Sequence, residues 1–127
     1  MGARETILIV DDDAALRRMY RAALSLEGYR VEEAADGDDA LVCIEQQAPD
    51  LILLDLEMPR VDGLSVQREI AANAFTRHIP IVIATGSGKS LNNVGVACVL
   101  RKPIAPDDLI RTIAECLAGQ APHVLSA

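Results

Sequence analysis

Acidic side chains directly follow two apolar runs of this chain. Asp11 and Asp12 come after residues 7–10, and Asp55 comes after residues 51–54. Runs of this length, rich in β-branched and aliphatic residues, are typical of buried parallel strands. In an open α/β sheet the carboxyl ends of neighbouring strands meet at one crevice, so we expect these acids to lie together. Crowded carboxylates repel one another, which favours a bound proton or a hard divalent cation, and we predict a Mg²⁺ site.

Two further strand ends carry polar side chains. Thr85 follows the apolar run 81–84, and Lys102 follows the run 96–100 after one intervening residue. A metal ion, a hydroxyl donor and a lysine are groups that stabilise charge on the oxygens of a phosphoryl group during its transfer. The acceptor is then a carboxylate. We predict Asp55 as this nucleophile, because it follows the central strand and the other groups can flank it.

The elements that position these residues alternate along the chain. Short apolar runs alternate with amphipathic stretches, the pattern of βα units wound around a parallel sheet, so we predict a doubly wound α/β domain with five strands. Asp13 stands at the N-cap position of the first predicted helix, and Gly28 stands where that helix should end. The predicted strands cover residues 6–10, 29–33, 50–54, 79–84 and 96–100, and the predicted helices cover 14–27, 37–47, 63–72 and 105–118.

Composition restricts the functions that are open to the chain. Its 127 residues, half of them apolar, suit one domain over residues 1–118, followed by a tail, 119–127, that we expect to be disordered. The net charge of −7 disfavours direct binding to nucleic acid or to an acidic membrane surface. No apolar stretch approaches the length of a membrane span, and the three cysteines lack metal-binding spacing. We therefore expect a cytoplasmic protein with reduced thiols.

Taken in order, these residues resemble the receiver domain of bacterial response regulators. The resemblance spans nearly the whole chain and rests on motifs that each stand at the end of a predicted strand. These motifs are Asp11-Asp12, Asp55 with Met58-Pro59 and Asp62-Gly63, Thr85, and Lys102-Pro103. The resemblance implies a flavodoxin-like sheet in the order 2-1-3-4-5. It also implies that the protein is a signalling domain, with no enzymatic activity beyond the Mg²⁺-assisted phosphorylation and dephosphorylation of its own aspartate.

The phosphoryl donor that the resemblance implies is a phosphohistidine of a sensor histidine kinase or of a phosphotransfer protein, with Asp55 as the acceptor. Mg²⁺ would be held by Asp12, Asp55 and the backbone carbonyl of Glu57, with Asp11 acting through water. We expect the Glu57 side chain itself to point outward beside the site. An unidentified downstream protein would then read the phosphorylated state through direct contact.

The resemblance also assigns roles to the groups on the other side of the acids. Lys102 would pair with the phosphoryl oxygens, and its peptide bond to Pro103 would be cis. Thr85 would turn toward the phosphate as a switch. Phosphorylation replaces a carboxylate with a group that has several strong acceptor oxygens, which gives the threonine hydroxyl a reason to move inward.

The chain departs from the family pattern in one region. Val99 occupies a position, three residues before the lysine, where receivers usually carry Phe or Tyr. The segment between Thr85 and Lys102 is also short and rich in Gly, Ser and Asn, so we predict that the fourth helix is absent or reduced to a turn. We hypothesise that phosphorylation orders or moves the 86–95 loop instead of repacking a helix.

Other functions fit the sequence less well. Residues 86–90 read Gly-Ser-Gly-Lys-Ser and resemble the end of a nucleotide-binding loop. However, the position of the first glycine of that loop is Ile83, and too few residues follow for the long helix that must face the phosphates. A haloacid-dehalogenase-like phosphatase would need an aspartate where Glu57 stands. Two alternatives stay open: a receiver cut from a hybrid kinase or larger regulator, and a binding module that works without phosphorylation.

Overall fold

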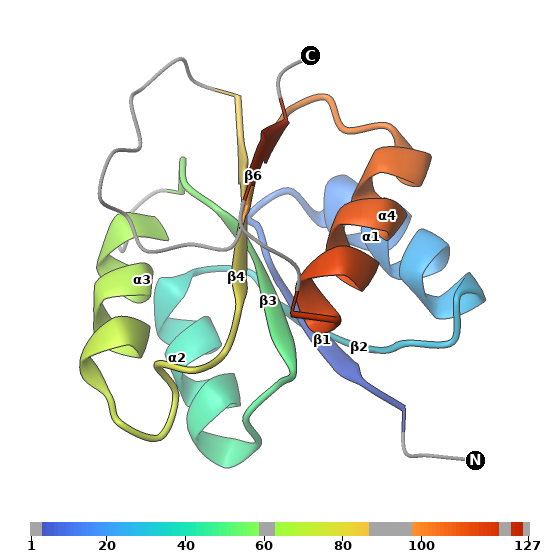
Figure 1. The fold of residues 1–127 in the computed structure, drawn as a ribbon. Coiled ribbons are helices and arrows are strands. Elements are labelled where there is room, and N and C mark those ends of the chain that lie inside the picture. Colours follow the sequence, from blue (N-terminus) through green and yellow to red (C-terminus); the bar gives the residue numbers. More distant parts are fainter. Residues whose placement is uncertain (1–3, 59–62, 87–97, 120–122, 126–127) are drawn as a thin grey trace.

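The apolar runs of the sequence form neighbouring strands of one parallel sheet (Figure 1). The computed structural model describes residues 4–58, 63–86, 98–119 and 123–125. The strands that the sequence predicted are β1 Thr6–Val10, β2 Arg30–Ala34, β3 Leu51–Asp55, β4 Ile81–Thr85 and β5 Cys98–Arg101. They pair in the order β2-β1-β3-β4-β5, which confirms the expected doubly wound topology.

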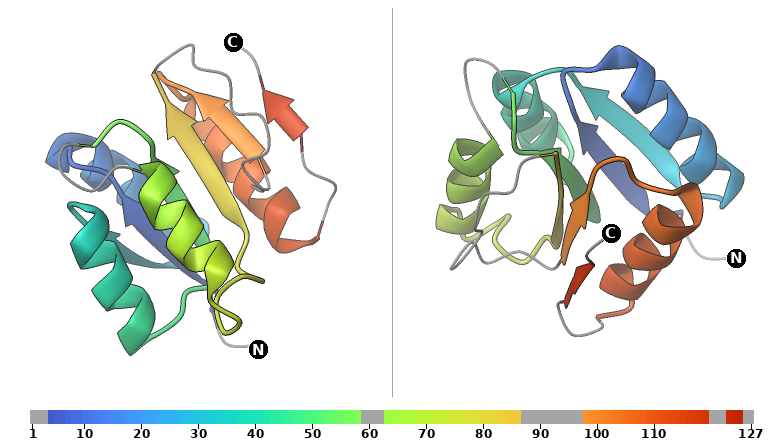
Figure 2. Two further views of the ribbon diagram at one scale, coloured as in Figure 1. Left: turned by 90° about the vertical axis from the view of Figure 1, so that its left-hand side faces the viewer. Right: turned by 90° about the horizontal axis from the view of Figure 1, so that it is seen from above.

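Two pairs of helices cover the two faces of the sheet (Figure 2). Helices α1 (Ala14–Leu26) and α4 (Pro106–Leu117) pack on one face, and α2 (Gly37–Gln46) and α3 (Gly63–Ala72) pack on the other. Successive residues of a strand point to opposite faces. Ile7 and Ile9 accordingly belong to the first core and Leu8 and Val10 to the second, which explains why residues 7–10 of β1 are all apolar. No helix in the described ranges is both long and apolar enough to cross a membrane.

The strand register fixes which residues meet at the carboxyl edge of the sheet. It aligns three pairs there: Val10 with Leu54, Asp55 with Ala84, and Thr85 with Arg101. Asp11, which follows Val10, therefore lies beside Asp55. Lys102, which follows Arg101, lies just beyond Thr85. The side chains that the sequence placed at strand ends are thus carried to a single edge by backbone pairing alone.

Side-chain caps set the starts of the first two helices. The carboxylate of Asp13 accepts hydrogen bonds from the N–H groups of Ala15 (2.9 Å) and Leu16 (3.2 Å), which confirms it as the N-cap of α1. Asp36 caps α2 in the same way through the N–H of Asp39. Helix α1 ends before Gly28, whose φ of +94° is a conformation that favours glycine.

The C-terminal tail corrects one expectation. Residues 119–127 were expected to be disordered, but His123–Leu125 form a sixth strand, β6, parallel to β5. This strand gives hydrogen-bond partners to the outer edge of β5, whose backbone groups would otherwise lack them. The sheet therefore has six strands in the order β2-β1-β3-β4-β5-β6 instead of five.

Several sequence predictions lie outside the described residues. The predicted loss of the fourth helix and almost all of the 86–95 loop fall within residues 87–97, and Pro59 and Asp62 fall within residues 59–62. The helix labelled α4 is the one predicted at 105–118. Val99 is buried in the core under α2 and α3, and the three cysteines are free thiols, with Cys98 and Cys116 buried.

At Gly63, the first residue of α3, the helix packs closely against the backbone at the end of β3. A Cβ atom at this position would lie 2.5 Å from the backbone oxygen of Asp55 and 2.7 Å from the Cα of Leu56. Both neighbours are backbone atoms and cannot rotate away. We predict that Gly63→Ala lowers the free energy of unfolding by about 2–3 kcal/mol, as measured by urea denaturation. Gly86→Ala is the control, because among the described residues the nearest atom to a Cβ there is 4.0 Å away; equal stability of the two variants would contradict the prediction.

Candidate functional site

Three carboxylates converge at the carboxyl edge of the sheet, as the sequence predicted. One oxygen each from Asp11, Asp12 and Asp55 can be chosen so that all lie within 4.8 Å of one another. Asp11 and Asp55 are only 2% and 3% exposed, whereas Asp12 is exposed. The cluster therefore consists of two buried carboxylates and one that is open to solvent, an arrangement that a hydrated cation can approach from outside.

Backbone groups hold the two buried acids in place. Asp11 Oδ1 accepts a hydrogen bond from the N–H of Asp13 (2.9 Å), so the residue that caps α1 also orients the neighbouring acid. Asp55 Oδ1 accepts one from the N–H of Glu57 (3.2 Å). The guanidinium of Arg17 donates to the backbone oxygen of Asp11 (2.7 Å), which ties the start of α1 to the end of β1.

Lys102 bridges the two buried carboxylates. Its Nζ lies 2.9 Å from Asp11 Oδ2 and 3.3 Å from Asp55 Oδ1. The N–H of Lys102 donates to the backbone oxygen of Thr85 (2.8 Å), which extends the pairing of β4 and β5 by one step. The following peptide bond, to Pro103, is cis, as predicted. The lysine thus acts as an internal counterion that joins the ends of β1, β3 and β5.

One cation does not balance the acids. Burial, followed by the charge of Asp11, raises the pKa of Asp55 to about 6, although Lys102 and the N–H of Glu57 act in the opposite direction. Burial lowers the pKa of Lys102, but the hydrogen bond and charge of Asp11, with the charge of Asp55, outweigh this effect and raise it overall. The site favours added positive charge, and its all-oxygen carboxylate donors suit Mg²⁺.

Thr85 and Glu57 are joined by a hydrogen bond that the sequence did not reveal. Thr85 is 2% exposed at the end of β4, and its hydroxyl donates to Glu57 Oε1 at 2.6 Å. The same oxygen accepts the N–H of Gly86 at 2.9 Å. The Glu57 side chain therefore turns toward the end of β4 instead of pointing away from the site. The backbone-carbonyl role that the resemblance implied for Glu57 stays a prediction.

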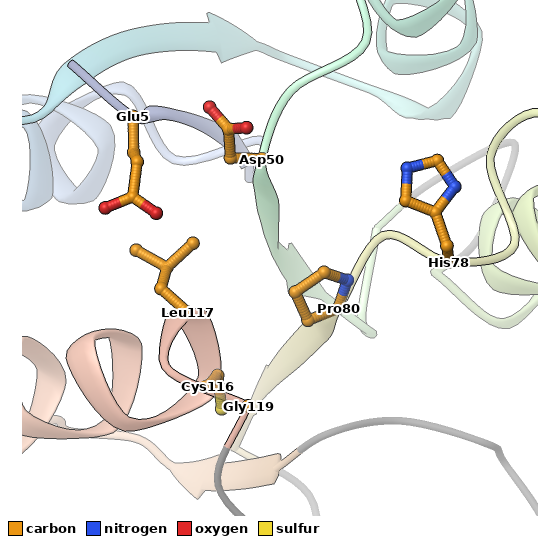
Figure 3. A pocket seen from close by; sticks show the side chains of 7 residues that line it. All are labelled: Glu5, Asp50, His78, Pro80, Cys116, Leu117 and Gly119. Carbon is orange, nitrogen blue, oxygen red and sulfur yellow. The ribbon is translucent and has the colours of Figure 1, made fainter. Parts of the chain in front are cut away.

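A separate surface pocket of about 440 Å³ lies at the opposite edge of the sheet (Figure 3). Its lining comes from residues just before β1, β3 and β4 and from the end of α4: Glu5, Asp50, His78, Pro80, Cys116, Leu117 and Gly119. Asp50 has a structural task there, since it accepts the N–H of Thr6 at 2.7 Å. Burial raises the pKa of the Cys116 thiol to about 11, so this thiol is a weak nucleophile. Because the lining residues Glu5, Asp50 and Pro80 precede their strands, whereas the acids stand at the carboxyl ends of the strands, the pocket is remote from the acidic cluster.

Comparison with known proteins gives a consistent family match. The family model described as "Response regulator receiver domain" matches residues 7–114. The chain is 35% identical over 123 residues to the phosphate regulon transcriptional regulatory protein PhoB of Pseudomonas aeruginosa, covering 93% of this chain and 54% of that protein. It is 42% identical over 115 residues to the response regulator PleD of Caulobacter vibrioides, covering 87% of this chain and 24% of that protein. The chain therefore spans about half, or less, of these two relatives.

Solved structures share the fold. A CheY-like response regulator receiver domain protein from Methanospirillum hungatei superposes with a TM-score of 0.86 at 31% identity, covering 93% of this chain and 97% of that one. The chemotaxis protein CheY4 of Vibrio cholerae gives a TM-score of 0.82 at 30% identity, covering 89% of this chain and 98% of that one. The likeness extends across nearly the full length of both structures.

The raised pKa of Asp55 predicts that the acidic cluster costs stability. A carboxyl group whose pKa is higher in the folded state than in the unfolded state destabilises the fold wherever it is ionised. We predict that Asp55→Asn is more stable than the parent chain by about 2–3 kcal/mol at pH 7.5 without Mg²⁺. The difference should shrink as the pH falls through about 6 and vanish below about 4. Urea denaturation across this range measures it.

The matched control is Asp107→Asn, which removes an exposed acid in the first turn of α4. This variant should stay within about 0.5 kcal/mol of the parent at every pH. If Asp55→Asn proves equal to the parent chain, or less stable, at pH 7.5, the buried carboxylate does not carry the cost that its surroundings imply.

Proposed function

The chain belongs to the response regulator receiver domain family of two-component systems, and we propose that it is a phosphorylation-dependent signalling domain with Asp55 as its phosphoryl acceptor. One observation carries the assignment of the acceptor. Among the three clustered acids, Asp55 is the one that lies between the Asp11 side of the site and the end of β4, where Thr85 stands. Lys102 contacts its carboxylate at 3.3 Å.

The proposed reaction is transfer to a carboxylate oxygen. An oxygen of ionised Asp55 attacks the phosphorus of a phosphohistidine on a sensor histidine kinase or phosphotransfer protein. The new O–P bond forms as the P–N bond breaks, and the imidazole leaves with the bonding electron pair. Asp55 is 3% exposed and the pKa of its carboxyl group is raised to about 6, so the carboxylate is poorly solvated yet still ionised at neutral pH, as a nucleophile requires. Hydrolysis of the acyl phosphate by water would return the carboxylate and end the signal.

Mg²⁺ would be held by Asp12, Asp55 and the backbone carbonyl of Glu57, with Asp11 acting through water. When bound, the ion supplies positive charge to the phosphoryl oxygens and offsets the repulsion between them and the carboxylates. The fit rests on the three carboxylates within 4.8 Å and on the exposed position of Asp12 at the mouth of the cluster.

Lys102 and Thr85 would respond to the new charge. Phosphorylation places acceptor oxygens near a lysine that already contacts Asp55, so the Nζ of Lys102 can shift from the carboxylates to the phosphoryl group. The hydroxyl of Thr85, at the neighbouring strand end, would turn to the same oxygens. This change in hydrogen bonding is the proposed signal, which we expect a partner protein to read through direct contact.

The chain covers only part of the relatives named above, so two forms of this function stay in view. It acts either as a stand-alone receiver or as the receiver of a larger regulator. PhoB is named as a transcriptional regulator, whereas for this chain we propose signalling through protein contacts, because its charge of −7 repels phosphate backbones. A cytoplasmic setting fits the free thiols of Cys43, Cys98 and Cys116.

The proposal predicts a Mg²⁺-dependent response to phosphoryl donors and mimics. Acetyl phosphate or beryllofluoride, added with Mg²⁺, should shift the amide NMR signals of Asp55, Thr85 and Gly86, and neither should do so without Mg²⁺.

Labelling by acetyl phosphate should be abolished in Asp55→Asn, because the attacking oxygen is gone, and retained in the control Asp107→Asn. Labelling that persists in Asp55→Asn would place the acceptor elsewhere. No response in the parent chain would favour a binding module that works without phosphorylation.

A further inference from the structure

One carboxylate oxygen at the edge of the site gathers two hydrogen-bond donors. Glu57 Oε1 accepts the hydroxyl of Thr85 at 2.6 Å and the N–H of Gly86 at 2.9 Å. A hydroxyl and a backbone N–H that converge on one negatively charged oxygen form an anion-binding arrangement. The anion bound there in this structure is the protein's own side chain.

These two donors lie where a phosphoryl group on Asp55 would need them. Asp55 is aligned with Ala84 in the pairing of β3 and β4, so the next residue of β4, Thr85, stands at the neighbouring strand end. Thr85 is also 2% exposed, so its hydroxyl is largely shielded from bulk solvent. A phosphoryl oxygen on Asp55 and the Glu57 carboxylate therefore seek the same pair of donors.

We propose that the Glu57 carboxylate is an internal competitor of the phosphoryl group. In the unphosphorylated protein it occupies the hydroxyl of Thr85 and the N–H of Gly86, and it gives up both donors when Asp55 is phosphorylated. This inference rests on the proposed function. It adds that the switch residue is held by a specific acid before activation, and that Glu57 acts as a positioning residue for Thr85.

The release of the two hydrogen bonds to Glu57 Oε1 can take place by side-chain movement. The N–H of Glu57 is anchored to Asp55 Oδ1 at 3.2 Å, so the backbone can stay in place. Glu57 itself is exposed, so its carboxylate can rotate into solvent and be hydrated there. Repulsion between this carboxylate and an incoming phosphoryl group also favours its release from Thr85 and Gly86. Thr85, in contrast, is buried and must exchange one hydrogen-bond acceptor for another.

The competition is tested by titrating the protein with beryllofluoride at saturating Mg²⁺, so that any change in metal affinity does not enter. We compare the parent chain with Glu57→Ala, Glu57→Gln and the control Glu45→Gln, an exposed acid on α2. Glu57→Ala should bind beryllofluoride about tenfold more tightly, since no hydrogen bond to an ionised group has to be broken first. Glu57→Gln should fall between Glu57→Ala and the parent, because its neutral oxygen still accepts, but more weakly. Glu45→Gln should match the parent.

The two variants separate competition for donors from simple charge repulsion. If repulsion alone mattered, Glu57→Gln and Glu57→Ala would bind beryllofluoride equally tightly, and that result would overturn the proposal. Equal affinity of Glu57→Ala and the parent would overturn it as well, while leaving the proposed function intact. If the parent chain fails to bind beryllofluoride at all, both the proposed function and this inference fall.

A second readout follows Thr85 and Gly86 directly. In the absence of beryllofluoride, Glu57→Ala should move the Gly86 amide signal and speed its hydrogen exchange, while signals of the core strands keep their positions and so report an intact fold. Replacing Thr85 with Ala removes one of the contested donors, so in that background the gain from Glu57→Ala should shrink severalfold. An undiminished gain would show that Glu57 does not act through Thr85.

Discussion

The ion pairs of Lys102 with Asp11 and Asp55 are the interaction on which the rest of the site depends. These three charged groups stand at the ends of β5, β1 and β3, so they meet when β1, β3, β4 and β5 are paired in register. Folding brings two carboxylates into a largely dry position, and a single lysine cannot neutralise both. The charge imbalance that makes the site costly to fold also favours the binding of a cation beside the carboxylates.

The parts of the site that were predictable from sequence are those fixed by strand ends. Asp11, Asp55 and Thr85 directly follow or end apolar runs, and parallel pairing brings such positions to one edge whatever the side chains are. The same logic located Lys102 one residue beyond β5. Helix limits were predictable to within one residue at each end. For α1 the reason is that Asp13 caps its start and Gly28 follows its end.

The parts that escaped prediction depend on contacts that leave no periodic pattern. The direction of the Glu57 side chain is set in a connection after β3, where neither a strand nor a helix fixes the rotamer, and its partners at Thr85 and Gly86 are 28 and 29 residues away. Residues 123–125 are too few to show the alternation or the apolar run of a strand. Their pairing depends on the free edge of β5, a tertiary feature that local sequence does not encode.

Strand β6 changes what the β5 edge of the sheet can do. An open edge strand is a template for strand addition by another polypeptide. Here β6 already occupies that edge, and only residues 118–122 connect it to the end of α4. A tether this short gives β6 an effective concentration at β5 in about the millimolar range. A foreign strand of similar affinity that is present at a lower concentration is therefore outcompeted, and β6 shields the outer edge of β5 from strand addition.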